Sequence, residues 1–353
     1  MRFVAAVPTA RVRSLLLVLC VAVPGRAPAW GEDGHRLVLR LALEALPAAA
    51  RSPYVGLDAD LARAVVEADS LSAVPAEACK HWIDVEKLDP GYLRSLRDAL
   101  QRQYGGEAYA DEDARAFATT VDHAAFRRDP PPWSAARLAP LWDALPPTLE
   151  GFRARYGRLE TFIGVIPYQP LLYTRALARS LAAGDRRRIV HAAGYLAHYV
   201  ADLHVPVHVT SDYKGQYSGN GIFKDRERDR GDVHVRFESG FVKAALPALE
   251  REARKTLATP GTPLSPRDIT PRALRAARAA YDLLDGVLKA DRDAARRHDP
   301  RDDWTGYLDA ARPVFEPVAA GRLGAAAALL RDLLLTAAAG ERLESPAGSS
   351  MMN

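Results

Sequence analysis

Residues 192–209, AAGYLAHYVADLHVPVHV, carry the pattern that decides the fold. Apolar residues recur at spacings of three and four until Pro206, which indicates a helix that ends at the proline. His198 and Asp202 are four residues apart, so on a helix both side chains leave the same face. His208 follows just past the proline. Titratable groups in such an apolar setting need partners, because burying them unpaired is costly.

Helical periodicity continues through most of the chain, in which Ala, Leu and Arg are abundant. We expect helices near residues 34–48, 58–71, 134–156, 170–183, 186–204, 233–256, 272–292 and 304–338. The sequence therefore predicts an all-α fold. We assign residues 30–340 to a single multi-helix domain, since no linker is long enough to separate a second one, and we expect the tail 341–353 to be disordered.

The first 29 residues have the features of a signal peptide. Three arginines precede the apolar run LLLVLCVAV (15–23), and Ala27-Pro28-Ala29 follows as an A-x-A cleavage site. The apolar run is too short to anchor the chain across a bilayer. We therefore expect export, to the periplasm or out of the cell, and a mature chain that begins at Trp30.

Charge and cysteine content restrict the function further. The full chain has 48 basic and 44 acidic side chains, and removing residues 1–29 leaves 44 of each. A mature protein without net charge is not a strongly basic duplex-binding or membrane-surface protein. Cys79 is the one cysteine outside the signal segment, so an exported form has no internal disulfide and depends on core burial or metal for its stability.

Two further segments repeat the combination of imidazole and carboxylate. In VHVRFES, His234 and Glu238 are again four residues apart, and in WGEDGH the expected new N-terminus at Trp30 is followed by His35. A free α-amino group and the carbonyl oxygen of the same residue can chelate a metal. Either helical pair alone is more often a surface ion pair, but together with the apolar setting of His198 they favour zinc, which prefers such ligands.

These motifs resemble the superfamily of zinc-dependent phospholipases C and single-strand-specific zinc nucleases. The matching pieces are WGEDGH, EADSL around Asp69, KHWID around His81, HYVADLHVPVH and VHVRFE, in the family order and over nearly the whole mature chain. The resemblance implies a helical domain around about three zinc ions, held mainly by His and carboxylate ligands.

The resemblance also implies a ligand set for each ion. The first ion would be held by Asp69, His81, His198 and Asp202; the second by the Trp30 amine and carbonyl, His35 and the bridging Asp202; and the third by His208, His234 and Glu238. Asp69 and Asp202 would be the catalytic carboxylates, with Asp69 orienting the nucleophile. His204 matches a family histidine that is not a ligand, and we expect it to support or pack against the site.

The resemblance implies hydrolysis of a phosphodiester by water that zinc has made acidic, without a serine or cysteine nucleophile. The nuclease branch is favoured by the five-residue spacing from Trp30 to His35 and by HWID, in which Trp82 would stack on a base and Asp84 would read its edge. The alternative for these two residues is that Trp82 belongs to the core and Asp84 is a solvated charge.

Glu238 argues for the phospholipase branch, which has Glu where the nucleases usually have Asp. The segment SDYKGQYSGNGIFKDRERDRG also departs from the nuclease pattern. We therefore expect a monomeric, exported zinc nuclease that cleaves single-stranded DNA or RNA and leaves 5′-phosphates. The alternatives are a phospholipase C acting on phospholipid head groups and, with less support, a non-catalytic protein in which zinc replaces disulfides as a staple.

Overall fold

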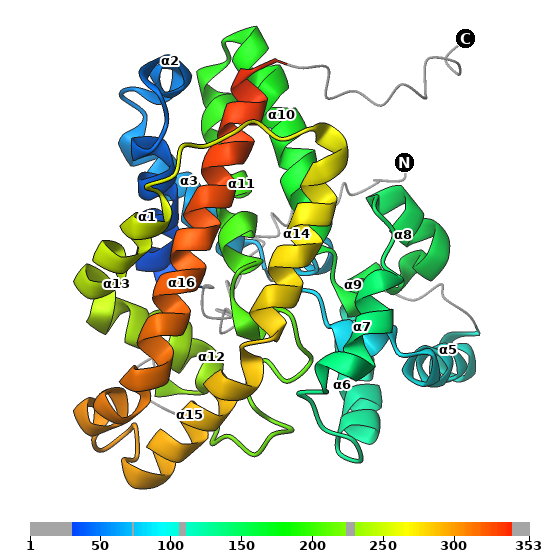
Figure 1. Ribbon diagram of the computed structural model, residues 1–353. Coiled ribbons are helices and arrows are strands. Elements are labelled where there is room, and N and C mark those ends of the chain that lie inside the picture. The colour runs from blue at the N-terminus through cyan, green and yellow to red at the C-terminus, as the bar shows by residue number, and fades with distance from the viewer. Residues whose placement is uncertain (1–29, 73, 106–110, 224–229, 341–353) are drawn as a thin grey trace, which may run out of the picture.

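The computed structural model describes residues 30–72, 74–105, 111–223 and 230–340 (Figure 1). The expected signal peptide, residues 1–29, and the expected disordered tail, residues 341–353, lie outside this part of the chain. The described residues form helices and loops and contain no strand, which confirms the all-α prediction.

The helices follow one another with short connections. The α-helices are α1 (Gly31–Glu44), α2 (Ala48–Arg51), α3 (Asp58–Ser70), α4 (Pro75–Ala78), α5 (Pro90–Tyr104), α6 (Asp111–Phe126), α7 (Ala135–Asp143), α8 (Leu149–Tyr156), α9 (Glu160–Ile163), α10 (Gln169–Ala183), α11 (Arg186–Asp202), α12 (Val233–Val235), α13 (Val242–Thr256), α14 (Pro266–Tyr281), α15 (Leu284–Arg297) and α16 (Trp304–Ala338). Short 3₁₀-helices lie at Ser52–Tyr54, Val85–Leu88, Gly157–Leu159, Ile166–Tyr168 and Pro206–His208, and Arg236–Phe241 forms a π-helix.

The long helix α16 runs along the bundle of long helices, at the front of the view in Figure 1. It packs against α13, α15, α1, α10 and α11, while α11 also packs against α3 and α10. Buried apolar side chains from α1 to α16 form one continuous core. Residues 192–202 of α11 are all buried, so the titratable residues at its end lie inside the bundle.

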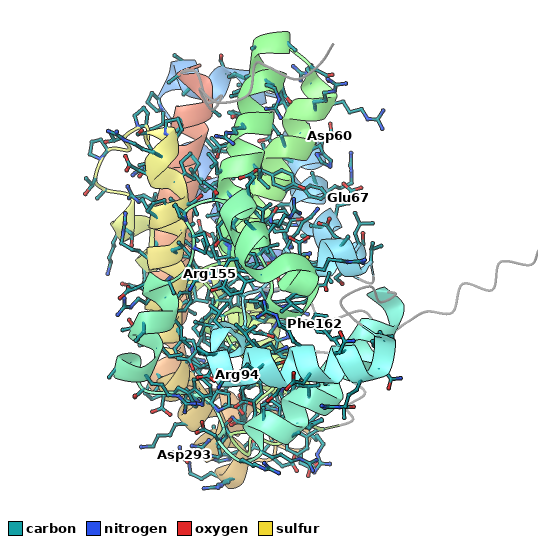
Figure 2. All side chains as sticks on the ribbon, turned by 90° about the vertical axis from the view of Figure 1, so that its right-hand side faces the viewer. Asp60, Glu67, Arg94, Arg155, Phe162 and Asp293 are labelled. Carbon is teal, nitrogen blue, oxygen red and sulfur yellow. The ribbon has the colours of Figure 1, made fainter. Side chains whose placement is uncertain are left out.

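Helices α5 to α9 form a separate layer beside these long helices (Figure 1). Figure 2 shows α5, marked by Arg94, lying across the direction of the upright helices. The Val85–Leu88 3₁₀-helix joins this layer to the long helices, since it contacts α5 and α7 while its Glu86 accepts hydrogen bonds from Thr210 and from Tyr281 of α14.

Most of the expected helices are present, with four differences. The segment 134–156 contains two helices, because Pro146-Pro147 interrupts it, and the segment 272–292 is divided between α14 and α15 at Asp282-Leu283, where the sequence has neither Gly nor Pro. Helices α5 and α6 were not among the expected segments. The segment 233–256 is helical but contains the π-helix, which its apolar periodicity does not reveal.

Candidate metal centre

The end of α11 supplies the central groups of the site. His198 Nε2 and Asp202 Oδ2 are 3.2 Å apart and both side chains are fully buried. The predicted one-turn pairing on a single helix face is therefore present. Their burial excludes a solvent-exposed surface ion pair.

Asp69 and His81 reach the same place from elsewhere in the chain. Asp69 lies in the last turn of α3, and His81 lies in the segment after α4. His81 Nδ1 is 2.9 Å from Asp202 Oδ2 and 3.0 Å from His198 Nε2, and Asp69 Oδ1 is 3.7 Å from His198 Nε2. The structure thus brings together the four residues predicted to hold one ion.

The start of α1 completes this side of the site. His35 Nε2 is 3.3 Å from Asp202 Oδ1, and its ring stacks on His198 with centroids 4.3 Å apart. Trp30 is fully buried, and its indole N–H donates a hydrogen bond to the Ala201 oxygen at 2.9 Å. Its carbonyl oxygen accepts from Gly34 N at 3.0 Å and keeps a second lone pair. The predicted chelation by the Trp30 amine requires cleavage of the bond between Ala29 and Trp30, and Ala29 lies outside the described residues.

His208, His234 and Glu238 form an adjoining group. His208 Nε2 is 2.9 Å from His234 Nε2 and 3.3 Å from Glu238 Oε2, while His234 Nε2 is 3.0 Å from Glu238 Oε1. The π-helix that begins at Arg236 does not separate the pair. His208 Nδ1 also lies 3.9 Å from Asp202 Oδ2, so the two groups are neighbours.

We call this set of eight side chains the histidine–carboxylate centre. It contains three triplets, and within each triplet the ligand atoms lie within 4.8 Å of one another: His35, Asp69 and His198; His81, His198 and Asp202; and His208, His234 and Glu238. The first two triplets share His198.

Backbone carbonyls fix the tautomers of two of the histidines. His198 Nδ1 donates to Val65 O at 2.8 Å, and His208 Nδ1 donates to His81 O at 2.6 Å. In the neutral rings each Nε2 therefore has its lone pair pointed into the centre. Such a partner on the opposite nitrogen is typical of histidines that bind metals.

Burial and neighbouring charges shift the pKa values of the centre's side chains in different directions. Burial lowers the pKa of His35 well below its ordinary value, and His198 lowers it further. Burial also acts to lower the pKa of His198, but the Asp202 and Asp69 carboxylates raise it to about 9. Burial, followed by the charges of Asp202 and Asp69, raises the pKa of Glu238 well above its usual range. A bound cation would favour neutral imidazoles and charged carboxylates throughout.

The residues present fit a metal such as zinc. Both ring nitrogens of His35 and the Oδ1 atom of Asp202 are buried and make no hydrogen bond within the described structure. Polar atoms left in this state are costly, and a metal ion between His35 Nε2 and Asp202 Oδ1, which are 3.3 Å apart, would satisfy these two atoms. Imidazole nitrogen and carboxylate oxygen are the donor types that zinc takes.

Trp82 and Asp84, the predicted substrate-binding residues, lie beside the centre in the chain that follows His81. Trp82 is half-buried and packs against the core, and its carbonyl is so close to Gly164 that a Cβ there would lie 2.1 Å from the Trp82 oxygen. Asp84 is 8% exposed, and its carboxylate lies 2.9 Å from Lys87 Nζ. Asp84 is not the solvated charge of the alternative interpretation, and its role toward a substrate stays a prediction.

Other polar residues around the centre have structural contacts. His204 is buried with Nδ1 donating to Val200 O at 2.7 Å, which agrees with the packing role expected for it. Tyr199 was not singled out from the sequence. Its ring contacts both His81 and His198, and its hydroxyl bonds to Glu77. In the sequence, the signal for its proximity to the centre was its position directly after His198 and before Asp202.

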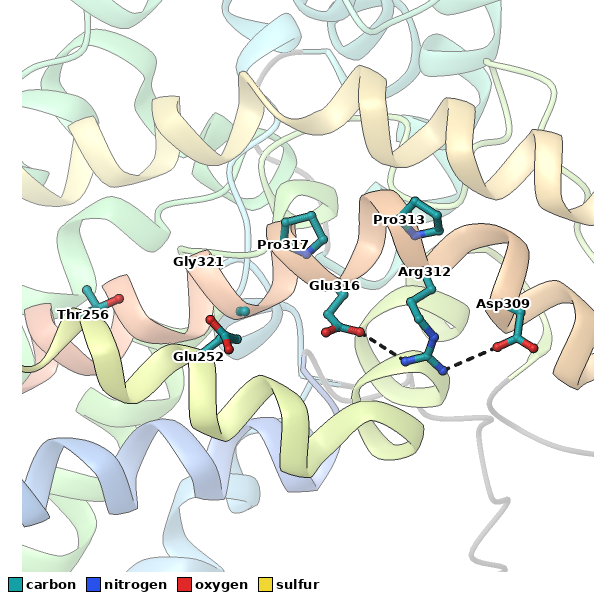
Figure 3. A pocket seen from close by; sticks show the side chains of 9 residues that line it. Glu252, Thr256, Asp309, Arg312, Pro313, Glu316, Pro317 and Gly321 are labelled. Carbon is teal, nitrogen blue, oxygen red and sulfur yellow. Dashed lines mark hydrogen bonds and ion pairs between the residues drawn. The ribbon is translucent and has the colours of Figure 1, made fainter.

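The hollow drawn in Figure 3 lies elsewhere, between α13 and α16. Its volume is about 670 Å³, and it is lined by Glu252, Thr256, Asp309, Arg312, Pro313, Glu316, Pro317, Ala320 and Gly321. None of these residues belongs to the histidine–carboxylate centre. Arg312 forms ion pairs with both Asp309 and Glu316, so part of the charge in this hollow is neutralised.

Within the described residues, no helix has the length and apolar character needed to cross a membrane. Models of known protein families do not match the sequence, and a search among curated proteins finds no match either. A function for the chain must therefore be argued from the side chains of the centre.

Proposed function

We propose that the protein is an exported zinc-dependent phosphodiesterase that cleaves single-stranded DNA or RNA and leaves 5′-phosphates. The observation that carries this proposal is the convergence of eight His, Asp and Glu side chains, from separate segments, into three contiguous triplets. These eight side chains are eight of the nine metal ligands expected from the resemblance to zinc nucleases and phospholipases C; the ninth, Trp30, precedes α1.

Each residue of the centre has a role in this proposal. Asp69, His81, His198 and Asp202 would hold one zinc ion; Trp30, His35 and Asp202 a second; and His208, His234 and Glu238 a third. Bound zinc would supply Lewis acidity, which lowers the pKa of water so that hydroxide is available to attack a phosphodiester near neutral pH. It would also supply positive charge opposite the phosphoryl oxygens.

The two oxygens of Asp202 support its bridging role. Oδ1 faces His35 at 3.3 Å, whereas Oδ2 faces His81 at 2.9 Å and His198 at 3.2 Å. One carboxylate thus presents an oxygen to each of the two neighbouring ligand sets. Because Asp202 is fully buried, cations on both sides would offset its desolvation.

Asp69 differs from Asp202 in its access to solvent. Its side chain is 15% exposed, compared with 0% for Asp202. A carboxylate at the outer border of the centre can accept a hydrogen bond from an incoming water and orient it toward the phosphorus. This position favours Asp69 as the residue that orients the nucleophile.

Trp82 is the residue on which the nuclease assignment depends. Its half-buried ring directly follows the ligand His81, so a base stacked on it would place the adjacent phosphodiester near the centre. Stacking of this kind contributes roughly 1–3 kcal/mol per base. Glu238 favours the alternative, a phospholipase C, because the resemblance associates Glu at this position with that branch.

The third alternative, a non-catalytic protein stapled by zinc, has less support. Structural zinc sites are closed by four protein ligands. His208, His234 and Glu238 are three, which leaves a coordination position for water or substrate.

The test is made on protein that begins at Trp30 and has not been exposed to chelator. Its metal content is measured by elemental analysis, and its activity is compared on single-stranded DNA and on micellar phosphatidylcholine. We expect about three zinc ions per chain and preferential cleavage of DNA. Preference for phosphatidylcholine would replace the nuclease by the phospholipase, and absence of metal would refute the proposal.

A further inference from the structure

Arg236 is a buried cation in the segment that supplies two ligands of the third site. It lies midway between His234 and Glu238, at the start of the π-helix, and it is 0% exposed. Residues two apart on a helix do not face each other. The Arg236 side chain accordingly leaves the histidine–carboxylate centre and meets Asp291 on α15.

The contact between Arg236 and Asp291 is bidentate. Nε donates to Oδ1 and Nη2 donates to Oδ2, both at 2.7 Å. Asp291 accepts two further hydrogen bonds, from the Tyr307 hydroxyl at 2.6 Å and from Asn220 Nδ2 at 2.6 Å. Nη1 of Arg236 donates to Gly221 O at 3.1 Å. We call these residues the Arg236/Asp291 network.

The network connects four parts of the fold. Arg236 belongs to the π-helix, Asn220 and Gly221 to the loop before it, Asp291 to α15, and Tyr307 to α16. A π-helix is rare, occurs mostly as a single widened turn and is frequently found at functional sites. The contacts of its buried face add to its own hydrogen bonds in fixing where its side chains point.

Stability alone does not account for such a pair. The desolvation of a buried Arg and Asp can cancel their attraction, and apolar replacements of similar volume are often neutral or stabilising. A planar bidentate pair is strict in its geometry, however, and therefore holds the backbone at Arg236 in one position. The ligands His234 and Glu238 flank that position on both sides.

We infer that the Arg236/Asp291 network is a positioning device that holds His234 and Glu238 in register with His208 and so sets the affinity of this site for a divalent cation. The inference rests on the proposed function, because it takes these three residues to be metal ligands. Arg236 and Asp291 act from behind the site, without touching the cation.

The test is a zinc titration of metal-free protein against a chromophoric chelator. The variant is Arg236→Met with Asp291→Leu, which removes both charges and keeps comparable volume. The matched control is Arg331→Met with Asp332→Leu, a buried pair on α16 whose other contacts, with Thr259, Thr262 and Arg272, are away from the centre. Thermal unfolding of each metal-free protein checks that it is folded.

We expect the Arg236/Asp291 double variant to bind one zinc ion about 10- to 100-fold more weakly than the wild type, as is found when groups that orient metal ligands are removed. The other ions should lose less affinity than this one, and the control should bind every ion as the wild type does. If the double variant does not fold, Tyr307→Phe, which deletes one hydrogen bond to Asp291, should weaken the same ion by a smaller factor.

Two results would overturn the inference, and they differ in what else they affect. Wild-type affinity for every ion in a folded variant would refute the positioning role and leave the proposed function intact. Absence of zinc uptake by the wild type would refute both.

Discussion

Residues 233–241 separate two buried polar clusters that differ in how their charges are balanced. On one side lies the histidine–carboxylate centre, in which imidazoles and carboxylates crowd together and some polar atoms make no hydrogen bond. On the other side lies the Arg236/Asp291 network, in which one cation and one anion satisfy each other. Buried charges therefore occur in this protein in two different arrangements. A closed pair fixes geometry, whereas an open cluster is completed by a ligand.

The largest expected effect is that of Asp202→Asn. The amide removes the negative charge that faces two ligand sets, and we expect activity on any phosphodiester to fall by more than about 100-fold, since even groups that only orient metal ligands contribute 10- to 100-fold. Elemental analysis should show that at least one metal ion is lost. Full metal content and full activity would refute the bridging role.

Asp291→Asn tests the closed cluster. It leaves Arg236 buried without its opposite charge, and breaking a buried pair in this way costs about 3–5 kcal/mol. Chemical denaturation should show this loss of unfolding free energy both with and without metal. A loss confined to the metal-loaded protein would mean that the Arg236/Asp291 network stabilises the protein only through the metal site.

Metal removal tests the open cluster. A ligand that binds the native state stabilises it by about 3–4 kcal/mol when its concentration is several hundred to a thousand times its dissociation constant. We therefore expect a strong chelator to lower the unfolding free energy by this amount for each tightly filled site, and added zinc to restore it. An unchanged unfolding curve in chelator would contradict the view that a cation completes the centre.

Trp82→Ala tests whether a base of the substrate stacks on this ring beside the centre. Loss of one stacked base should raise the KM for oligonucleotides by the equivalent of about 1–3 kcal/mol. Hydrolysis of a small phosphodiester without a base is the control and should be unaffected. Equal effects on both substrates would instead indicate that Trp82 supports the fold around Gly164.

The smallest effect is expected on the surface, where Glu250 pairs with Arg40 and Arg254. These hydrogen bonds lower the pKa of Glu250 to about 2. Its stabilisation is therefore present above the unfolded-state pKa, near 4.5, and is lost as the pH falls toward 2. Because the pair is largely exposed, Glu250→Gln should cost no more than about 1 kcal/mol at pH 7. The cost should vanish near pH 2, and denaturation curves at both pH values would show this.

The sequence predicts the local part of the centre well. The pairing of His198 with Asp202 follows from their spacing on one helix, and the structure confirms their common face. The pairing of His234 with Glu238 was inferred from the same spacing, and the two are 3.0 Å apart even though a π-helix begins between them. That π-helix could not be predicted, because one widened turn does not alter the apolar periodicity of its neighbours.

Long-range polar contacts outside the expected ligand set are the part that the sequence does not reveal. Arg236 and Asp291 are 55 residues apart, and nothing in VHVRFES identifies the partner of its arginine. The contact of Asp84 is short-range in the sequence, but it was not predicted either. Lys87 follows it by three residues, which was a signal for the ion pair that the structure shows.

The connection between His81 and His208 bears on the order in which the centre would fill. His208 donates to the backbone oxygen of His81, and Ile83 N donates to the backbone oxygen of His208 at 3.0 Å. His81 and His208, which are proposed to bind different ions, are thus joined by two hydrogen bonds. An ion that orders His81 would also lower the conformational entropy that His208 has to lose, so uptake of successive ions is expected to be cooperative rather than stepwise and independent.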